Sequence, residues 1–104
     1  MIFYGKKVIF IGAHPDDIEL GCDALIAHIS DKTDVRCVTL SDNQKNLALK
    51  NLVGEHYLSM EKLGVPKEKV VLMDFETRQL PHARQEILEF LFQLNSEHRP
   101  DMVF

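Results

Sequence analysis

The stretch Val8-Ile9-Phe10-Ile11-Gly12-Ala13 decides the fold, because it is apolar without interruption and rich in β-branched residues. A strand with one wet face alternates apolar and polar residues, whereas a strand covered on both faces does not. We therefore expect a buried central strand here. It ends where the ionisable residues of His14-Pro15-Asp16-Asp17 begin, so the chain leaves the sheet at that point.

Short strand-like runs alternate with longer helical segments along the rest of the chain, without a repeat, a linker or a change in composition. The patterns predict strands at 35–40, 70–73 and 102–104, helices at 20–30, 45–63 and 81–98, and a polar loop at 41–44. Such alternation is typical of a parallel sheet with helices packed on it. We expect an α/β fold with an open parallel sheet, formed by one domain over residues 1–104.

Apolar residues at helical spacing predict the buried face of each helix. In the first helix the residues that we expect to face the sheet are Leu20, Ala24, Ala27, Leu25 and Ile29. The corresponding set in the second helix is Leu49, Leu52, Val53, Met60 and Leu63, with Gly64 and Pro66 as the stop. In the third helix Pro81 suits the first turn, and the buried stripe is Ile87, Leu88, Leu91 and Leu94.

The predicted strand at 102–104 has little length in which to pair, because it occupies the last three residues of the sequence. We therefore expect that the domain is truncated at its fourth strand. A natural short edge strand is the alternative.

Ionisable residues gather between the first strand and its helix, where ligands of open α/β sheets collect. His14 and Asp17 stand three positions apart, and imidazole and carboxylate both bind zinc. Asp16 lies between them, where an ionised carboxylate can accept a proton from water. The pattern predicts a metal site with His14 and Asp17 as ligands and Asp16 as the base.

A simpler alternative uses the same residues. Asp16 and Asp17 can cap the following helix, where acidic side chains favour the helix dipole, and His14 is then a polar turn residue. Pro15 fits both interpretations, because it fixes its own φ and biases His14 towards an extended conformation. The spacing alone leaves both open.

The order Ala13-His14-Pro15-Asp16-Asp17, followed by Glu19-Leu20-Gly21-Cys22, resembles the first motif of the LmbE-like, or PIG-L-type, N-acetylglucosaminyl deacetylase family. Glu55, eight residues before Leu63-Gly64-Val65, resembles that family's second helix, and residues 99–104 resemble the strand before its second catalytic motif.

The resemblance implies a Rossmann-like domain that binds one zinc ion and hydrolyses the amide of an N-acetylated amino sugar or a related small molecule. It implies that His14 and Asp17 are zinc ligands and that Asp16 is the general base. Zinc activates water near neutral pH and polarises a carbonyl, which agrees with amide hydrolysis.

The sequence departs from the family's pattern at several positions. Residues 23–25 are Asp-Ala-Leu, where the family has two glycines and a threonine, and Leu52 stands at a position that is often arginine. The family's third zinc ligand is a histidine beyond the strand at 102–104, so we expect these 104 residues to be inactive by themselves. Of the other histidines, His28, His56 and His98 are not expected to reach the site, and His82 is the exception, because the loop after the third strand lies on the same edge as His14. Arg78, matched by arginine in a subgroup, is expected to bind an anionic group of the substrate.

Composition excludes several classes of partner. The net charge is −4, with lysines and arginines scattered, so neither nucleic acid nor an anionic lipid surface is expected to bind. The apolar runs are far shorter than the ~20 residues that span a bilayer, so we expect a cytoplasmic protein. Cys22 and Cys37 have no Cys-x-x-Cys spacing and are expected to be free, buried thiols of a reducing compartment.

Two other functions remain as alternatives. A non-catalytic α/β module would act by pairing its fourth-strand edge with a second copy, as a homo-oligomer, or with another protein. Nucleotide binding is disfavoured, because Gly12-Ala13-His14-Pro15 is no glycine-rich phosphate cradle and the two aspartates would repel phosphate.

Overall fold

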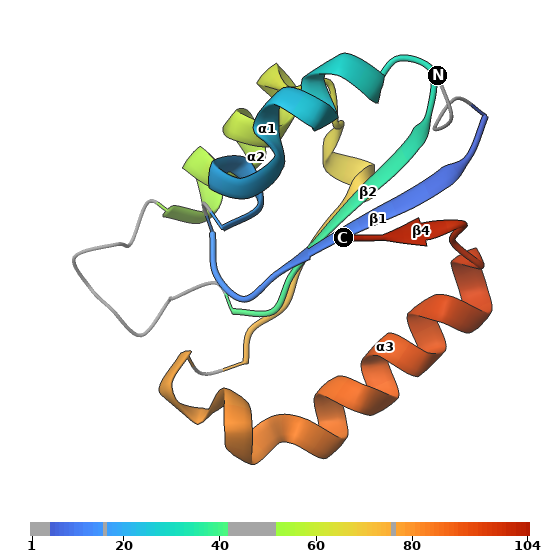
Figure 1. Ribbon diagram of the computed structural model, residues 1–104. Helices are drawn as coiled ribbons and strands as arrows, with labels where there is room; N and C mark the ends of the chain where they lie inside the picture. Colours follow the sequence, from blue (N-terminus) through green and yellow to red (C-terminus); the bar gives the residue numbers. More distant parts are fainter. Residues whose placement is uncertain (1–4, 16, 42–51, 76) are drawn as a thin grey trace.

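Four parallel strands form a sheet in the order β3-β2-β1-β4 in the computed structural model, which describes residues 5–15, 17–41, 52–75 and 77–104 (Figure 1). β1 (Lys7–Gly12) lies between β2 (Asp34–Thr39) and β4 (Met102–Val103), and β3 (Val70–Leu72) pairs with β2. The expected α/β class with an open parallel sheet is confirmed, and so is the interior position of the first strand.

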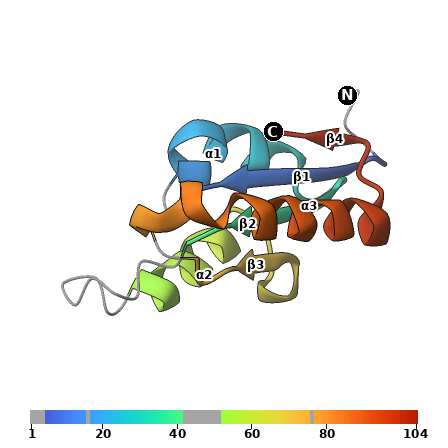
Figure 2. The same ribbon diagram turned by 90° about the horizontal axis from the view of Figure 1, so that it is seen from below.

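Helices cover both faces of this sheet. α1 (Asp17–Ile29) and α2 (Leu52–Lys62) lie on one face and α3 (Arg84–His98) on the other (Figure 1). Val8 and Phe10 of β1 belong to the apolar cluster beneath α1 and α2, while Ile9 packs in the cluster that contains Leu94 of α3. Because neighbouring side chains of β1 enter opposite apolar layers, its sequence is apolar without interruption. The turned view in Figure 2 shows α3 running along the sheet.

α2 ends before Gly64, as predicted. Gly64 has a φ of +93°, and the N–H groups of Gly64 and Val65 donate to the carbonyls of Glu61 and Met60 at 3.0 and 2.9 Å. This is the Schellman arrangement, which needs a left-handed residue and therefore favours glycine. The predicted loop at 42–44 and helical turns at 45–51, with Leu49, lie outside the described residues.

The predicted buried face of α1 is confirmed for Ile29 and Leu25 and wrong for the other three residues. Leu20 is 86% exposed, and Ala24 and Ala27 are also exposed. The buried residues of α1 are Ile18, Ile26 and Ile29, with Cys22 and Leu25 packed beside them. The set Leu20, Ala24 and Ala27 also has helical spacing, but the three isoleucines carry far more apolar surface, so their burial is favoured.

α3 differs from its prediction in two respects. A 3₁₀ segment, η3 (Thr77–Ala83), contains Pro81, and the α-helix begins only at Arg84. Leu88 is 46% exposed rather than buried. Leu94 is buried, Ile87 is half-buried, and Phe90 and Leu91 pack against the cluster formed by Ile9, Val38 and Leu94.

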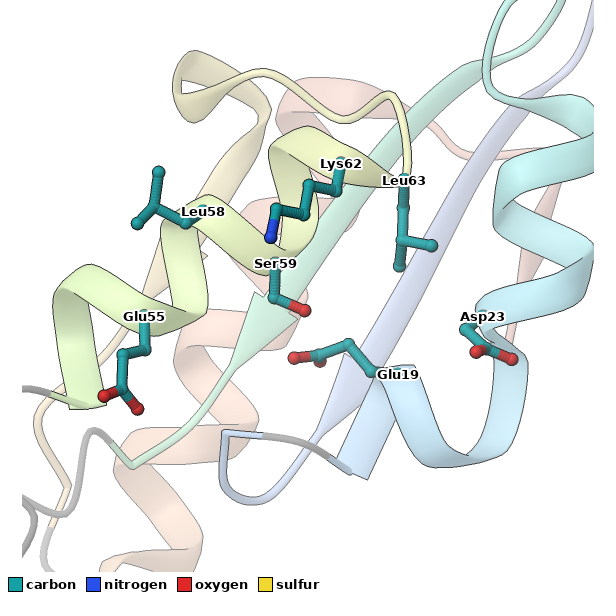
Figure 3. Close-up of a pocket in the computed structure, with 7 residues that line it drawn as sticks. All are labelled: Glu19, Asp23, Glu55, Leu58, Ser59, Lys62 and Leu63. Carbon is teal, nitrogen blue, oxygen red and sulfur yellow. The ribbon is translucent and has the colours of Figure 1, made fainter.

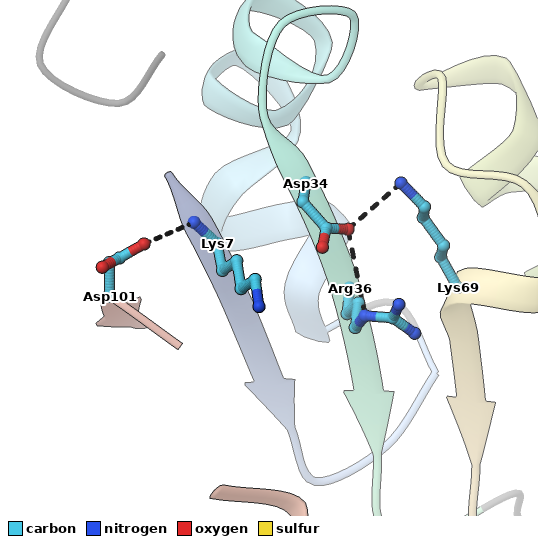
Figure 4. A network of polar contacts seen from close by, with 5 residues as sticks. All are labelled: Lys7, Asp34, Arg36, Lys69 and Asp101. Atoms are coloured by element: carbon cyan, nitrogen blue, oxygen red, sulfur yellow. Dashed lines mark hydrogen bonds and ion pairs between the residues drawn. The ribbon is translucent and has the colours of Figure 1, made fainter. Parts of the chain in front are cut away.

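β4 pairs with β1 over its short length, although little length for pairing was expected. Met102 and Val103 stand opposite Val8 and Ile9, and the Phe104 ring stacks on Phe10 with centroids 5.2 Å apart. The Lys7 N–H donates to the Asp101 carboxylate at 2.8 Å, which fixes the start of β4 (Figure 4).

A second polar group lies at the amino ends of the neighbouring strands. The Asp34 carboxylate of β2 is 3.1 Å from Lys69 Nζ and 3.8 Å from Arg36 Nε (Figure 4). Because His14 follows the carboxyl end of β1, this group lies at the other edge of the sheet. It therefore joins strands rather than building the candidate site.

No helix within the described ranges is long and apolar enough to cross a membrane. Cys37 is buried as predicted, and Cys22 is only half-buried; both are free thiols.

Candidate functional site

The edge at the carboxyl ends of the strands contains the point where the strand order reverses. β2 and β3 follow on one side of β1, whereas β4 lies on its other side. Ligands of open α/β sheets bind outside the strand ends at such a point. The chain segment that leaves β1 here contains His14 and Asp17, so the topology brings the predicted ligands to the expected place.

Backbone hydrogen bonds hold this edge beyond the last paired residues. The N–H of Ser41 donates to the carbonyl of Ala13 at 2.9 Å, and the N–H of Phe75 donates to the carbonyl of Leu40 at 3.2 Å. Pro15 is buried, and Ser41 is 1% exposed. The turn that carries His14 is therefore anchored to the loop after β2.

His14 and Asp17 lie side by side. Asp17 Oδ2 accepts a hydrogen bond from the backbone N–H of His14 at 2.9 Å and lies 3.5 Å from His14 Nδ1. The Asp17 N–H donates back to the His14 carbonyl at 3.2 Å. Asp17 is also the first residue of α1, where a carboxylate favours the helix dipole. The ligand and capping interpretations of Asp17 therefore both agree with its position.

The donor atoms suit a shared metal ion. A separation of 3.5 Å between Nδ1 and Oδ2 is long for a hydrogen bond. Two atoms bound tetrahedrally to one zinc ion stand roughly 3.3–3.6 Å apart. Two buried polar atoms at this edge, His14 Nε2 and Thr39 Oγ1, have no hydrogen-bond partner among the described residues. Buried polar atoms without a partner are rare and call for an explanation, of which a bound water or ion is one.

The structure gives less information on the other predicted site residues. Asp16, the expected base, lies outside the described residues. The backbone of Arg78 lies in η3, which follows β3 at the carboxyl edge, and His82 is exposed in the same segment. Within residues 5–15, 17–41, 52–75 and 77–104, no group of three or more histidine, cysteine, aspartate or glutamate side chains is arranged to hold a metal.

A pocket of about 380 Å³ lies between α1 and α2 (Figure 3). Its lining is formed by Glu19, Asp23, Glu55, Leu58, Ser59, Lys62 and Leu63. Neither His14 nor Asp17 lines it. Glu19, in the first turn of α1, points into this pocket towards α2.

One polar pair was missed by the sequence analysis. His56 of α2 is 2% exposed, and its Nδ1 lies 3.6 Å from Glu19 Oε2. The sequence could have indicated that His56 is buried, since it stands four positions before the apolar Met60 and so on the same face of α2. The sequence provides no reason to expect His56 at the metal site, and its contact with a neighbouring helix was not predicted.

Burial also affects Cys37 in β2. Loss of hydration, with added repulsion from Glu19 and Cys22, raises the pKa of the Cys37 thiol from 9.0 to about 12. Cys37 therefore stays protonated and is an apolar core residue, not a nucleophile.

Comparisons with known proteins agree with this fold and motif. The family model of the PIG-L GlcNAc-PI de-N-acetylases matches residues 9–104. An uncharacterized deacetylase of Escherichia coli K12, YaiS, is 59% identical over 27 residues, which are 26% of this chain and 15% of YaiS. The crystal structure of the conserved protein TT1542 from Thermus thermophilus matches with a TM-score of 0.73 and 22% identity, over 95% of this chain and 45% of TT1542.

The chain thus spans less than half of TT1542, and at that identity the likeness concerns the fold alone. The family model covers nearly the whole chain, and its match includes the motif at 13–22 that begins where β1 ends. By that match, the chain belongs to the PIG-L, or LmbE-like, family of de-N-acetylases.

Proposed function

We propose that this chain supplies the first part of a zinc site in an N-deacetylase. The substrate class is an N-acetylated amino sugar or a related small-molecule amide, and the products are acetate and a free amine. The observation that carries the proposal is the pairing of His14 and Asp17, whose Nδ1 and Oδ2 atoms lie 3.5 Å apart at the strand-order reversal. Membership of the family supports the same chemistry.

Each residue has a distinct role in the proposal. His14 and Asp17 hold the zinc ion, and Asp16 accepts the proton of the attacking water as general base. Zinc in such a site supplies Lewis acidity, which activates water and polarises the amide carbonyl. Arg78, in the segment after β3, binds an anionic group of the substrate.

Binding by these two side chains alone is expected to be weak. Catalytic zinc sites have three protein ligands, and the proposal assigns two of them to described residues. We therefore expect the 104 residues by themselves to release no acetate from N-acetylglucosamine compounds. Acetate release above the blank would contradict this part of the proposal.

Cobalt substitution tests the ligand assignment without requiring activity. Co²⁺ added to the protein should give visible absorption bands from nitrogen and oxygen coordination. The bands should disappear in His14→Ala and persist in His28→Ala, which removes an exposed histidine from the last turn of α1. Bands that persist in His14→Ala would refute the assignment of His14.

A second candidate function has its own observation. Val103 is 56% and Phe104 48% exposed at β4, which is an edge strand. Apolar edge strands pair readily with other chains. We propose as the alternative a non-catalytic module that self-associates through this edge. Light scattering coupled to size-exclusion chromatography decides it: a dimer mass that Val103→Lys converts to a monomer favours the module, and a monomer in both contradicts it.

A further inference from the structure

The contact between Glu19 and His56 is the most fully buried polar contact between helices in the described structure. The His56 side chain is 0% exposed and that of Glu19 is 12% exposed, with 3.6 Å between Nδ1 and Oε2. Both imidazole nitrogens and both carboxylate oxygens are buried, and none has a hydrogen-bond partner among the described residues, because 3.6 Å is beyond hydrogen-bond range. Burying four such atoms is costly, and the electrostatic contact between the two side chains offsets part of that cost. The contact at 3.6 Å is the polar contact that the described structure gives the two side chains.

This contact joins the first turn of α1 to the middle of α2. Where both helices end, Ser30 Oγ donates to the Leu63 carbonyl at 2.9 Å. Glu19 is in the first turn of α1 and His56 is five residues into α2, whereas Ser30 and Leu63 directly follow the ends of the two helices. The two helices thus run side by side in the same direction, with one polar contact between the start of α1 and the middle of α2 and another where both helices end. These contacts differ in one respect, since only the first lies beside the candidate metal site.

Glu19 and Asp17 stand in the first turn of α1, two residues apart. Asp17 exchanges backbone and side-chain hydrogen bonds with His14, so the orientation of this turn sets the separation of Nδ1 and Oδ2. Asp17 itself is 47% exposed in its side chain and has little packing to hold it. What fixes the turn is Ile18 in the core on one side and Glu19 against His56 on the other.

We propose that His56 is a positioning residue for the metal site: by holding Glu19, it fixes the first turn of α1 and with it the geometry between Asp17 and His14. This inference rests on the proposed zinc function. Partners behind the ligands of a metal commonly change its affinity by about 10–100-fold when they are removed. His56 would contact neither ligand directly, and would act on the metal site through Glu19 and the backbone of the turn.

Two variants of similar size separate positioning from packing. His56→Leu fills the space but leaves Glu19 without a polar partner, whereas His56→Gln keeps an N–H donor for the carboxylate. Ser30→Ala is the matched control, because it removes the polar contact where the same two helices end. Should His56→Leu fail to fold, Glu19→Met removes the same contact from the other side.

The first readout is the zinc dissociation constant, measured by competition with a chromogenic chelator. We expect it to rise at least about 10-fold in His56→Leu, or in Glu19→Met, and to stay near the wild-type value in His56→Gln and Ser30→Ala. Equal zinc affinity in the leucine and glutamine variants would overturn the inference. So would an equal loss in Ser30→Ala, since the effect would then be a general loosening of the helix pair.

The second readout needs no metal. Hydrogen exchange of the His14 N–H, which donates to Asp17 Oδ2, reports whether the turn is held in zinc-free protein. Exchange should be faster in His56→Leu than in wild type and unchanged in Ser30→Ala. If wild type bound no zinc, the proposed function would fail, and the exchange rates would still decide the role of His56: equal rates in all variants would refute it.

Discussion

A single oxygen of Asp17, Oδ2, faces two atoms of His14: it accepts the backbone N–H at 2.9 Å and lies 3.5 Å from Nδ1 of the ring. One carboxylate thus both closes the turn after β1 and stands in place as a neighbouring metal donor. The two roles can be separated, because the first needs only an acceptor oxygen and the second needs a charged one.

Asp17→Asn tests this separation. The amide oxygen still accepts the His14 N–H, so the melting temperature should fall only slightly. The loss is that of the charge–dipole interaction at the start of α1, which is worth about 0.3–1 kcal/mol of unfolding free energy. Zinc affinity should fall at least about 10-fold, because a neutral amide is a poor zinc ligand. Thermal melting and a zinc competition titration give the two values. Unchanged zinc affinity would mean that Asp17 only caps the helix.

Gly12 permits the close approach of α1 to the end of β1. A Cβ at this position would lie 2.9 Å from Ile18 Cγ1 and 3.2 Å from Asp17 Cβ, so Gly12→Ala should lower the free energy of unfolding by about 1–3 kcal/mol. Gly21 is the control, since a Cβ there meets nothing within 4 Å and lies inside α1. Gly21→Ala should stabilise by roughly 0.5–1 kcal/mol. Urea unfolding measures both, and a neutral Gly12→Ala would show that the helix start can move.

The buried face of α1 can be verified by a pair of substitutions. Ile26 is 0% exposed, so Ile26→Ala should cost about 2–5 kcal/mol through lost burial and a cavity. Leu20 is 86% exposed, so Leu20→Lys should change stability by less than about 0.5 kcal/mol. Urea titrations of both variants measure the costs. A larger loss of stability in Leu20→Lys than in Ile26→Ala would restore the face expected from the sequence.

The raised pKa of Cys37 predicts a loss of stability in alkali. Below pH 9.0 the thiol is protonated in the folded and the unfolded chain; between pH 9.0 and about 12 the unfolded chain loses the proton and the folded chain keeps it. The free energy of unfolding should therefore fall with rising pH, with a contribution of about 1.4 kcal/mol per pH unit from this group. Cys37→Ala should show a shallower fall in urea titrations from pH 8 to 11. Identical slopes would indicate that Cys37 ionises normally.

Sequence patterns predicted those parts of the fold that depend on local chemistry. The unbroken apolar run of β1 indicated burial on both faces, and Gly64 marked the end of α2 through its left-handed conformation. The buried face of α1 could not be chosen by spacing, because Leu20-Ala24-Ala27 and Ile18-Cys22-Ile29 both recur at helical intervals. Only the sheet decides between them. The late start of α3 has a similar origin, since Pro81 is equally compatible with a 3₁₀ turn.

In the candidate site too, local features could be predicted from the sequence, whereas contacts between distant residues could not. An i, i+3 spacing after a strand was enough to expect His14 and Asp17 to be neighbours, and they are. The spacing could not reveal that Glu19 turns towards α2, because that depends on His56, which is 37 residues further along the chain. The role of Asp16 as the base stays a prediction.

The central claim is that His14 helps to hold zinc at the end of β1, and zinc per chain tests it most directly. Wild type and His14→Ala should be dialysed to equilibrium against the same zinc buffer and compared by elemental analysis, with circular dichroism as the check on folding. We predict bound zinc in wild type above the dialysis buffer and its loss in His14→Ala, with unchanged helical content. Equal zinc in both proteins, or none in either, would contradict the claim.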